Sequence, residues 1–129
     1  QGFGRVNLDR SVKRALTTLD GPGLKTGDKS TFTVKVPTAS NTLRIALCYS
    51  DFPGPVLINN LNLIVTDPAG KRYVGNQPSS AGGTLTLDST NNVEVVQVGK
   101  AKKGNWTVDV VASNVSTGSQ DFALAAVLV

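Results

Sequence analysis

The side chains of this sequence that could do chemistry are carboxylates and amides in segments rich in Asp, Asn and Gly. Hard cations such as Ca²⁺ prefer oxygen ligands of these types. Asn in a turn also satisfies backbone groups or accepts a left-handed conformation, so a metal site and a set of turn-forming residues are both open interpretations. The candidate ligands are Asp51, Asn60, Asn62, Asn76, Asp88, Asn91, Asn92 and Glu94.

Few residues of this chain could carry out acid–base or nucleophilic catalysis. The chain has no histidine and a single cysteine, Cys48, so it can form neither a Ser/His/Asp triad nor an internal disulfide. The sole Glu, Glu94, lies in a strand-like run, and no acidic pair stands out. Cys48 alternates with Leu47 and Tyr49, which favours a buried, inert thiol. We therefore expect no enzyme activity from this chain alone.

The net charge of +4 comes largely from two small basic clusters. Nucleic-acid binding requires a continuous basic face interleaved with stacking aromatic residues, which these clusters lack, so we expect no nucleic-acid partner. No apolar run approaches the ~18 residues of a membrane span, so we expect no membrane partner. The clusters are Arg5, Arg10, Lys13 and Arg14 near the start, and Lys100, Lys102 and Lys103 later in the chain.

Two features concern processing and location. Asn105-Trp106-Thr107 and Asn114-Val115-Ser116 are N-glycosylation sequons, so Asn105 and Asn114 are glycan-acceptor candidates in a secreted protein. Asn114 is the better candidate because it falls in a predicted polar turn. The chain begins QGFGRVNLDR, without an initiator Met or a signal sequence, which predicts a fragment of a longer polypeptide.

One element expected to position these groups is a hairpin between Asn59 and Asn76. Leu61, Leu63 and Val65 alternate with other residues and predict a half-buried strand. Asp67-Pro68-Ala69-Gly70 has the residue preferences of a type I turn, so residues 71–74 are predicted to return beside the first strand.

The rest of the chain predicts further short strands after one N-terminal helix. Residues 5–16 have apolar side chains at helical spacing, and residues 19–30, rich in Gly, Pro and Asp, predict a linker. Many short strands without intervening helices indicate an all-β fold, an antiparallel β-sandwich or jelly roll of about eight strands. FALAAVLV at the end is apolar on both faces, which predicts a central strand or one with a covered outer face. The other predicted strands are 31–36, 43–49, 85–87, 93–98, 106–112 and 122–129.

Taken together, several motifs carry a family resemblance. They are QGFGRVNLDRSV, LRIALCYSDFPG, NNLNLIVTDPAGKRYVGN, NNVEVVQV, GNWTVDVVASNV and QDFALAAV. In this order they resemble the C-terminal β-sandwich, similar to the P domain of kexin-type convertases, of high-molecular-weight alkaline subtilases. The resemblance implies that residues 1–20 end a subtilase catalytic domain whose triad lies upstream, and that residues 21–129 form the C-terminal domain. It implies an interface with that catalytic domain through Phe3, Val6, Leu8 and Val12.

The sequence also departs from the family pattern. The family commonly has Trp at position 48 and Asp at positions 60, 62 and 77, where this chain has Cys48, Asn60, Asn62 and Gln77. Affinity for Ca²⁺ depends on the charge of the ligands, so any calcium site should be weak, and no cofactor is required. The resemblance implies that such a site would use Asp88, Asn62, Asn76 and Asn92.

The resulting hypothesis is a non-catalytic accessory domain of a secreted subtilisin-like serine endopeptidase. Its partners would be the catalytic domain of the same polypeptide, which it stabilises, and protein substrates whose access it shapes. The alternative is a substrate-anchoring module for insoluble protein or polysaccharide, suggested by the sandwich fold and by two aromatic residues expected in exposed loops, Phe52 and Tyr73.

Overall fold

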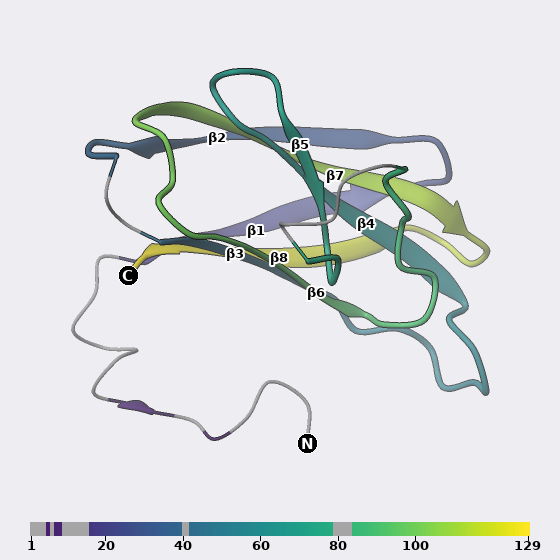
Figure 1. The fold of residues 1–129 in the computed structure, drawn as a ribbon. Coiled ribbons are helices and arrows are strands. Elements are labelled where there is room, and N and C mark those ends of the chain that lie inside the picture. The colour runs from purple at the N-terminus through teal and green to yellow at the C-terminus, as the bar shows by residue number, and fades with distance from the viewer. Residues whose placement is uncertain (1–4, 6, 9–15, 40–41, 79–83) are drawn as a thin grey trace.

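Two four-stranded antiparallel sheets lie face to face in the computed structural model, which describes residues 5, 7–8, 16–39, 42–78 and 84–129 (Figure 1). Sheet A has the strand order β1-β8-β3-β6 and sheet B the order β2-β7-β4-β5. This confirms the predicted antiparallel β-sandwich of about eight strands. The strands are β1 (Leu16–Leu24), β2 (Lys29–Val36), β3 (Leu43–Cys48), β4 (Asn59–Thr66), β5 (Arg72–Val74), β6 (Val93–Val98), β7 (Gly104–Val115) and β8 (Gln120–Leu128).

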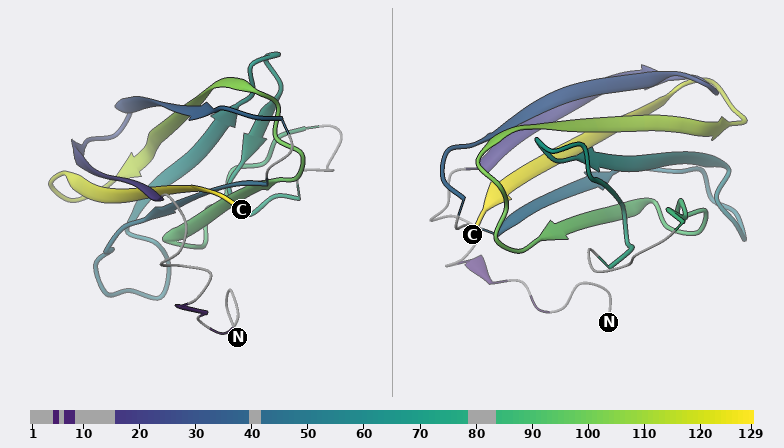
Figure 2. Two further views of the ribbon diagram at one scale, coloured as in Figure 1. Left: turned by 90° about the vertical axis from the view of Figure 1, so that its left-hand side faces the viewer. Right: turned by 45° about the horizontal axis from the view of Figure 1, so that its top comes forward.

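Figure 2 shows the two sheets as the layers of the sandwich. Their inner faces meet in one apolar layer of side chains. Successive side chains of a strand point to opposite faces, and burial follows this alternation. In β3, for example, Leu43, Ile45 and Leu47 are buried while Arg44 is exposed. Apart from a few aromatic rings the layer is aliphatic, as the abundance of strand-forming Val and Leu suggests.

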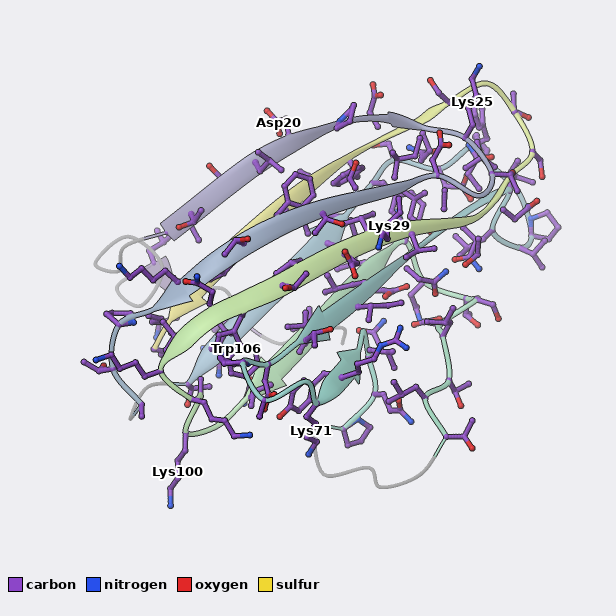
Figure 3. All side chains as sticks on the ribbon, turned by 90° about the horizontal axis from the view of Figure 1, so that it is seen from above. Asp20, Lys25, Lys29, Lys71, Lys100 and Trp106 are labelled. Atoms are coloured by element: carbon purple, nitrogen blue, oxygen red, sulfur yellow. The ribbon has the colours of Figure 1, made fainter. Side chains whose placement is uncertain are left out.

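Trp106 of β7 is the largest fully buried side chain of this layer. Its ring stacks on Tyr73 of β5 at a centroid distance of 5.9 Å, and its indole Nε1 donates a 2.8 Å hydrogen bond to the carbonyl oxygen of Lys102. Figure 3 shows Trp106 at the end of the sandwich where Lys71 and Lys100 project. Lys71 Nζ lies 5.0 Å from the centre of the Tyr73 ring. The sequence-based prediction of an exposed Tyr73 is wrong, because Tyr73 lies opposite the inward-facing Val65 of β4 and its ring packs on Trp106.

The β4–β5 hairpin has the predicted turn. The amide of Gly70 donates to the carbonyl of Asp67 at 2.9 Å, and Gly70 takes a positive φ of 86°, which costs glycine least. The buried Asp67 carboxylate accepts hydrogen bonds from the amides of Ala69 and Lys71 and a 2.8 Å ion pair from Lys102. Burial by itself raises the pKa of Asp67, but these bonds outweigh it and hold that pKa below its ordinary value.

Strand β1 corrects the prediction of a linker over residues 19–30. Residues 16–24 pair with β8, and β2 already begins at Lys29. The Gly-Pro-Gly run sits at a register shift between Gly21 and Leu24, and a Cβ on Gly21 would collide with the Phe122 ring. These residues therefore serve close strand packing and a bulge, which sequence alone does not distinguish from a loop.

Four further sequence-based predictions concern a helix, a short strand, a turn and the place of the last strand. The helix predicted over residues 5–16 falls mostly outside the described residues, and its last residue, Leu16, begins β1. Residues 85–87 form no strand, because the chain there leads into the turn around Asp88. Asn114 lies in strand β7 rather than in a turn. The central position predicted for FALAAVLV is confirmed, since β8 lies between β1 and β3.

Replacing Asp67 with Ala should lower the free energy of unfolding by about 2–3 kcal/mol, because two amides and the ammonium of Lys102 lose a buried acceptor. Urea unfolding measures this change. The matched control is Asp20→Ala in exposed β1, for which we expect a change within about 0.5 kcal/mol. Equal stability of the Asp67 variant and the wild type would contradict the role assigned to this turn.

Candidate functional site

Asp88 is the centre of the polar cluster in which calcium ligands were predicted. Its Oδ1 accepts hydrogen bonds from the amides of Thr90 and Asn91, and its Oδ2 accepts from the side-chain amides of Asn76 and Asn91 at 2.6 and 2.8 Å. Burial raises the pKa of Asp88, but these four donors outweigh it and keep the pKa below its ordinary value. The carboxylate is thus stabilised as an anion by N–H donors.

Asn76 and Asn92 tie the cluster to sheet A. Asn76, at a positive φ of 59°, exchanges two 3.0 Å hydrogen bonds with the backbone of Val95 in β6. Asn92 donates from its side chain to the carbonyl of Tyr49 at 2.8 Å. Asn76 therefore substitutes for backbone pairing at the edge where β6 has no further neighbour in its sheet, whereas Asn92 continues the pairing of β3 with β6 beyond Val93.

Asn62 lies apart from this cluster in its bonding. Its side-chain nitrogen donates to Asn60 Oδ1 at 3.0 Å and to Ser113 Oγ at 2.8 Å, between strands β4 and β7. Its Oδ1 is buried and without a partner. In the described part of the chain, no three or more His, Cys, Asp or Glu side chains gather as metal ligands. The four residues predicted for calcium thus do not form one convergent oxygen cage.

Asp51, another candidate ligand, closes the loop before β4. Its two carboxylate oxygens accept hydrogen bonds from the amides of Ile58 and Asn59 at 2.7 and 2.9 Å. The side chain of Asn59 is fully buried and bonds to Gln120 at 3.0 Å and to the amides of Ser116 and Thr117. These polar residues hold two connections together, the one between β3 and β4 and the one between β7 and β8.

Glu94 is the most unusual group of the molecule. It points into the core between the sheets and is only 1% exposed. Its Oε2 accepts a 2.8 Å hydrogen bond from the amide of Leu63 in β4, whereas Oε1 is buried without a partner. Gly75 lies against the carboxyl group, where a side chain would collide with it.

The environment of Glu94 favours the neutral carboxylic acid. Burial raises its pKa from 4.5 to about 7, although the Leu63 amide lowers it, and the charge of Asp88 adds to the rise. Burial likewise raises the pKa of nearby Tyr49 to about 12. The sequence offered Glu94 as a catalytic carboxylate or an oxygen ligand, and its place in the same two-residue alternation as the buried Val96 and Val98 of this strand is the signal that it faces inward.

The outer faces of the two sheets differ in chemistry. The outer face of sheet B, over β2 and β7, is polar, and Thr31 and Lys29 there contact Asp109 at 2.6 and 3.8 Å (Figure 3). The outer face of sheet A carries small apolar side chains and Cys48. The exposed position of Cys48 corrects the prediction of a buried thiol: Leu47 and Tyr49 are the inward residues of that alternation, so Cys48 must point outward.

A hollow of about 650 Å³ adjoins the outer face of sheet A at one end. Its wall includes the carboxylates Asp20 and Asp121, the thiol of Cys48 and the ring of Phe52, which is 52% exposed. A smaller apolar cleft of about 190 Å³ opens between the edge strands β1 and β2, lined by Leu19, Phe32 and Leu124 among others.

Most of the predicted interface residues lie outside the described part of the chain, and the predicted glycan acceptors lie within it. Phe3, Val6 and Val12, predicted at an interface, lie outside the described residues, and Leu8 is 68% exposed. The sequon residues Asn105 and Asn114 are both exposed on β7, and the side chain of Asn114 bonds to Ser116 Oγ at 2.9 Å. Within the described residues, no helix has the length and apolar character to cross a membrane.

Comparison with known proteins finds a distant relative. No protein-family model matches the chain. The chain is 25% identical, over 145 aligned positions, to the serine protease/ABC transporter B family protein tagA of Dictyostelium discoideum. The alignment takes in 96% of this chain but only 8% of that protein. The chain is therefore similar to a small part of a much longer protein named as a serine protease.

Solved structures show a related fold. The Aeromonas hydrophila periplasmic inhibitor of g-type lysozyme, PliG, superposes with a TM-score of 0.54 at 16% identity, covering 90% of this chain and 88% of the inhibitor. At this identity the likeness concerns the fold alone. The Bacillus licheniformis lipase BlEst2 in its propeptide form matches with a TM-score of 0.43 over 21% of its chain, which supports no inference.

Stability should depend on pH through Glu94. Between pH 4.5 and about 7 the folded chain retains a proton that the unfolded chain has released, so stability falls as pH rises and levels off above pH 7. The loss should be on the order of 3 kcal/mol. Glu94→Gln should remove this slope, measured by urea unfolding at several pH values, whereas the control Asp20→Asn should keep it. A slope that persists in Glu94→Gln would contradict this assignment.

Calcium should have little effect on stability, because N–H donors already occupy the oxygens of Asp88. At a Ca²⁺ concentration equal to Kd the stabilisation is RT ln 2, about 0.4 kcal/mol, and we expect less than this at millimolar Ca²⁺. Differential scanning calorimetry with CaCl₂ and with chelator measures the effect. A rise of several degrees in Tm that chelator reverses and Asp88→Asn abolishes would reveal a calcium site and overturn this expectation.

Proposed function

We propose that this chain is a non-catalytic accessory domain of a secreted subtilisin-like serine endopeptidase. The observation that carries the proposal is the alignment of 96% of the chain with 8% of a protein named as a serine protease. The sequence motifs from the N-terminal QGFGRVNLDRSV to the C-terminal QDFALAAV support the subtilase assignment. Under this proposal the catalytic residues belong to another domain of the same polypeptide.

The chemistry of the described polar groups supports a role in contact. The carboxylates of Asp51, Asp67 and Asp88 are each committed to backbone amides that define a loop or turn. Such groups stabilise a rigid scaffold. A rigid domain that contacts only the native state of a neighbour raises the stability of that neighbour, and a covalent tether strengthens the effect through a high effective concentration.

The N-terminal segment is part of this proposal. We assign Phe3, Val6, Leu8 and Val12 to the interface with the catalytic domain, and the high exposure of Leu8 in the isolated chain supports this assignment. Asn105 and Asn114 are proposed as glycan acceptors in the secreted protein, consistent with their exposure on β7.

A substrate-anchoring module is the second candidate. Exposed Phe52 beside the hollow favours it, but Tyr73, the other aromatic residue considered, is buried against Trp106. Sedimentation of the chain with collagen, chitin and cellulose separates the two candidates. A structural accessory domain should stay in the supernatant, whereas an anchoring module should pellet and lose binding in Phe52→Ala.

Deleting residues 16–129 from the full-length protease should lower the Tm of its catalytic domain by several degrees and change its cleavage of large protein substrates. Cleavage of a short peptide at low temperature should stay close to that of the undeleted enzyme, because no triad residue is removed. Calorimetry and the two activity assays provide the measurement. Unchanged melting together with unchanged protein-substrate range would refute the proposed function.

A further inference from the structure

The outer face of sheet A has a centre of small apolar side chains, contributed by the neighbouring strands β8, β3 and β6. Cross-strand register aligns Ala46 of β3 with Ala125 of β8 and with Val95 of β6. These three residues are half-buried without belonging to the core. The whole face consists of Leu16, Thr18 and Asp20, then Asp121, Ala123, Ala125 and Val127, then Arg44, Ala46 and Cys48, and finally Val93, Val95 and Gln97.

This composition is unusual for a sheet face that meets water. Along each strand of an antiparallel sandwich, apolar residues that face the core usually alternate with polar residues that face water. Sheet B follows that rule, because β2 presents Lys29, Thr31, Thr33 and Lys35 outward. On sheet A the charged side chains of this face are Asp20 and Asp121 at one end and Arg44, which is paired with Gln97 at 2.8 Å. None of the residues of β8 from Ala123 to Val127 is charged. A contiguous apolar patch of this kind marks a contact surface.

The course of the chain indicates what covers this face. Leu16, the first residue of β1, is 53% exposed and lies on this same face, in register with Val127 of β8. β1 is an edge strand of sheet A, and Figure 1 shows its start beside the C-terminal end of β8. A domain joined to the N-terminal side of β1 would thus be tethered at an edge of sheet A, whereas sheet B forms the other layer of the sandwich (Figure 2).

We propose that the outer face of sheet A docks onto the protease domain that precedes this chain in the same polypeptide. The inference rests on the proposed function and specifies the surface that it uses. The continuity of this face with the entry point of the chain argues for a tethered partner, as does the similarity of the chain to a small part of a much longer protein. The adjoining hollow beside Phe52 would receive a protruding side chain of that domain.

The wild-type protein can test this placement because Cys48 lies on the docking face. In the isolated 129-residue chain its exposed thiol should react readily with a maleimide. In the full-length protein the reaction should be at least tenfold slower, as measured by peptide mapping of the modified Cys48. Equal rates in the two proteins would overturn the docking surface.

Paired variants test the same surface through stability. Ala125→Lys and Val95→Lys place a charge on the face in β8 and β6, and Thr33→Lys places the same charge on exposed β2 of sheet B as the control. In the full-length protein the first two should lower the Tm of the protease domain by several degrees and restore the reactivity of Cys48, whereas the control should do neither. The melting of each isolated chain reports whether the variant itself folds.

The outcomes separate this inference from the proposed function. If deletion of residues 16–129 destabilises the protease domain but the sheet A variants do not and Cys48 stays reactive, the docking surface is wrong and the accessory role stands. If deletion has no effect either, both fail. If light scattering shows that the isolated chain is a dimer which Val95→Lys dissociates, the occupant is a second copy, and the proposal of a protease domain is overturned.

Discussion

The packing of two sheets around the buried Trp106 is the constraint on which the rest of the structure depends. A fully buried indole must satisfy its N–H group, and the carbonyl of Lys102 does so, which sets the turn before β7. The same lysine reaches Asp67 and thereby links that turn to the β4–β5 hairpin. Once the inner face is set, the two-residue alternation of each strand dictates which side chains point outward.

The edge between β4 and β6 shows how the sandwich compensates where strand pairing ends. β5 has only three residues, so the amide of Leu63 lacks a strand partner there and bonds to the carboxyl of Glu94 instead. Asn76 similarly pairs with Val95 across the gap between the sheets. Burying a carboxyl group is costly unless it is neutral or paired, and the raised pKa of Glu94 is the physical result.

The carboxylates of the described loops are committed to local structure. The carboxylates of Asp51, Asp67 and Asp88 each stabilise a loop or turn. The unpartnered side-chain oxygens of Asn62 and Glu94 lie in two different places, because Asn62 bonds between β4 and β7 whereas Glu94 points between the sheets. The outer face of sheet B is polar over β2 and β7, whereas the outer face of sheet A has small apolar side chains at its centre, so the two sides of the sandwich differ in chemistry.

The sequence by itself determined the fold class, the hairpin with its Asp67 turn and the central place of the last strand, because alternation and turn chemistry are local signals. It did not reveal strand β1, since a Gly-Pro-Gly run that packs against Phe122 has the composition of a loop. It also placed Cys48 inside and Tyr73 outside, although alternation in β3 puts Cys48 on the outer face and pairing with Val65 of β4 turns Tyr73 inward. Only the tertiary structure decided which candidate ligands bond to one another and that Glu94 is buried, because these depend on contacts between strands far apart in the chain.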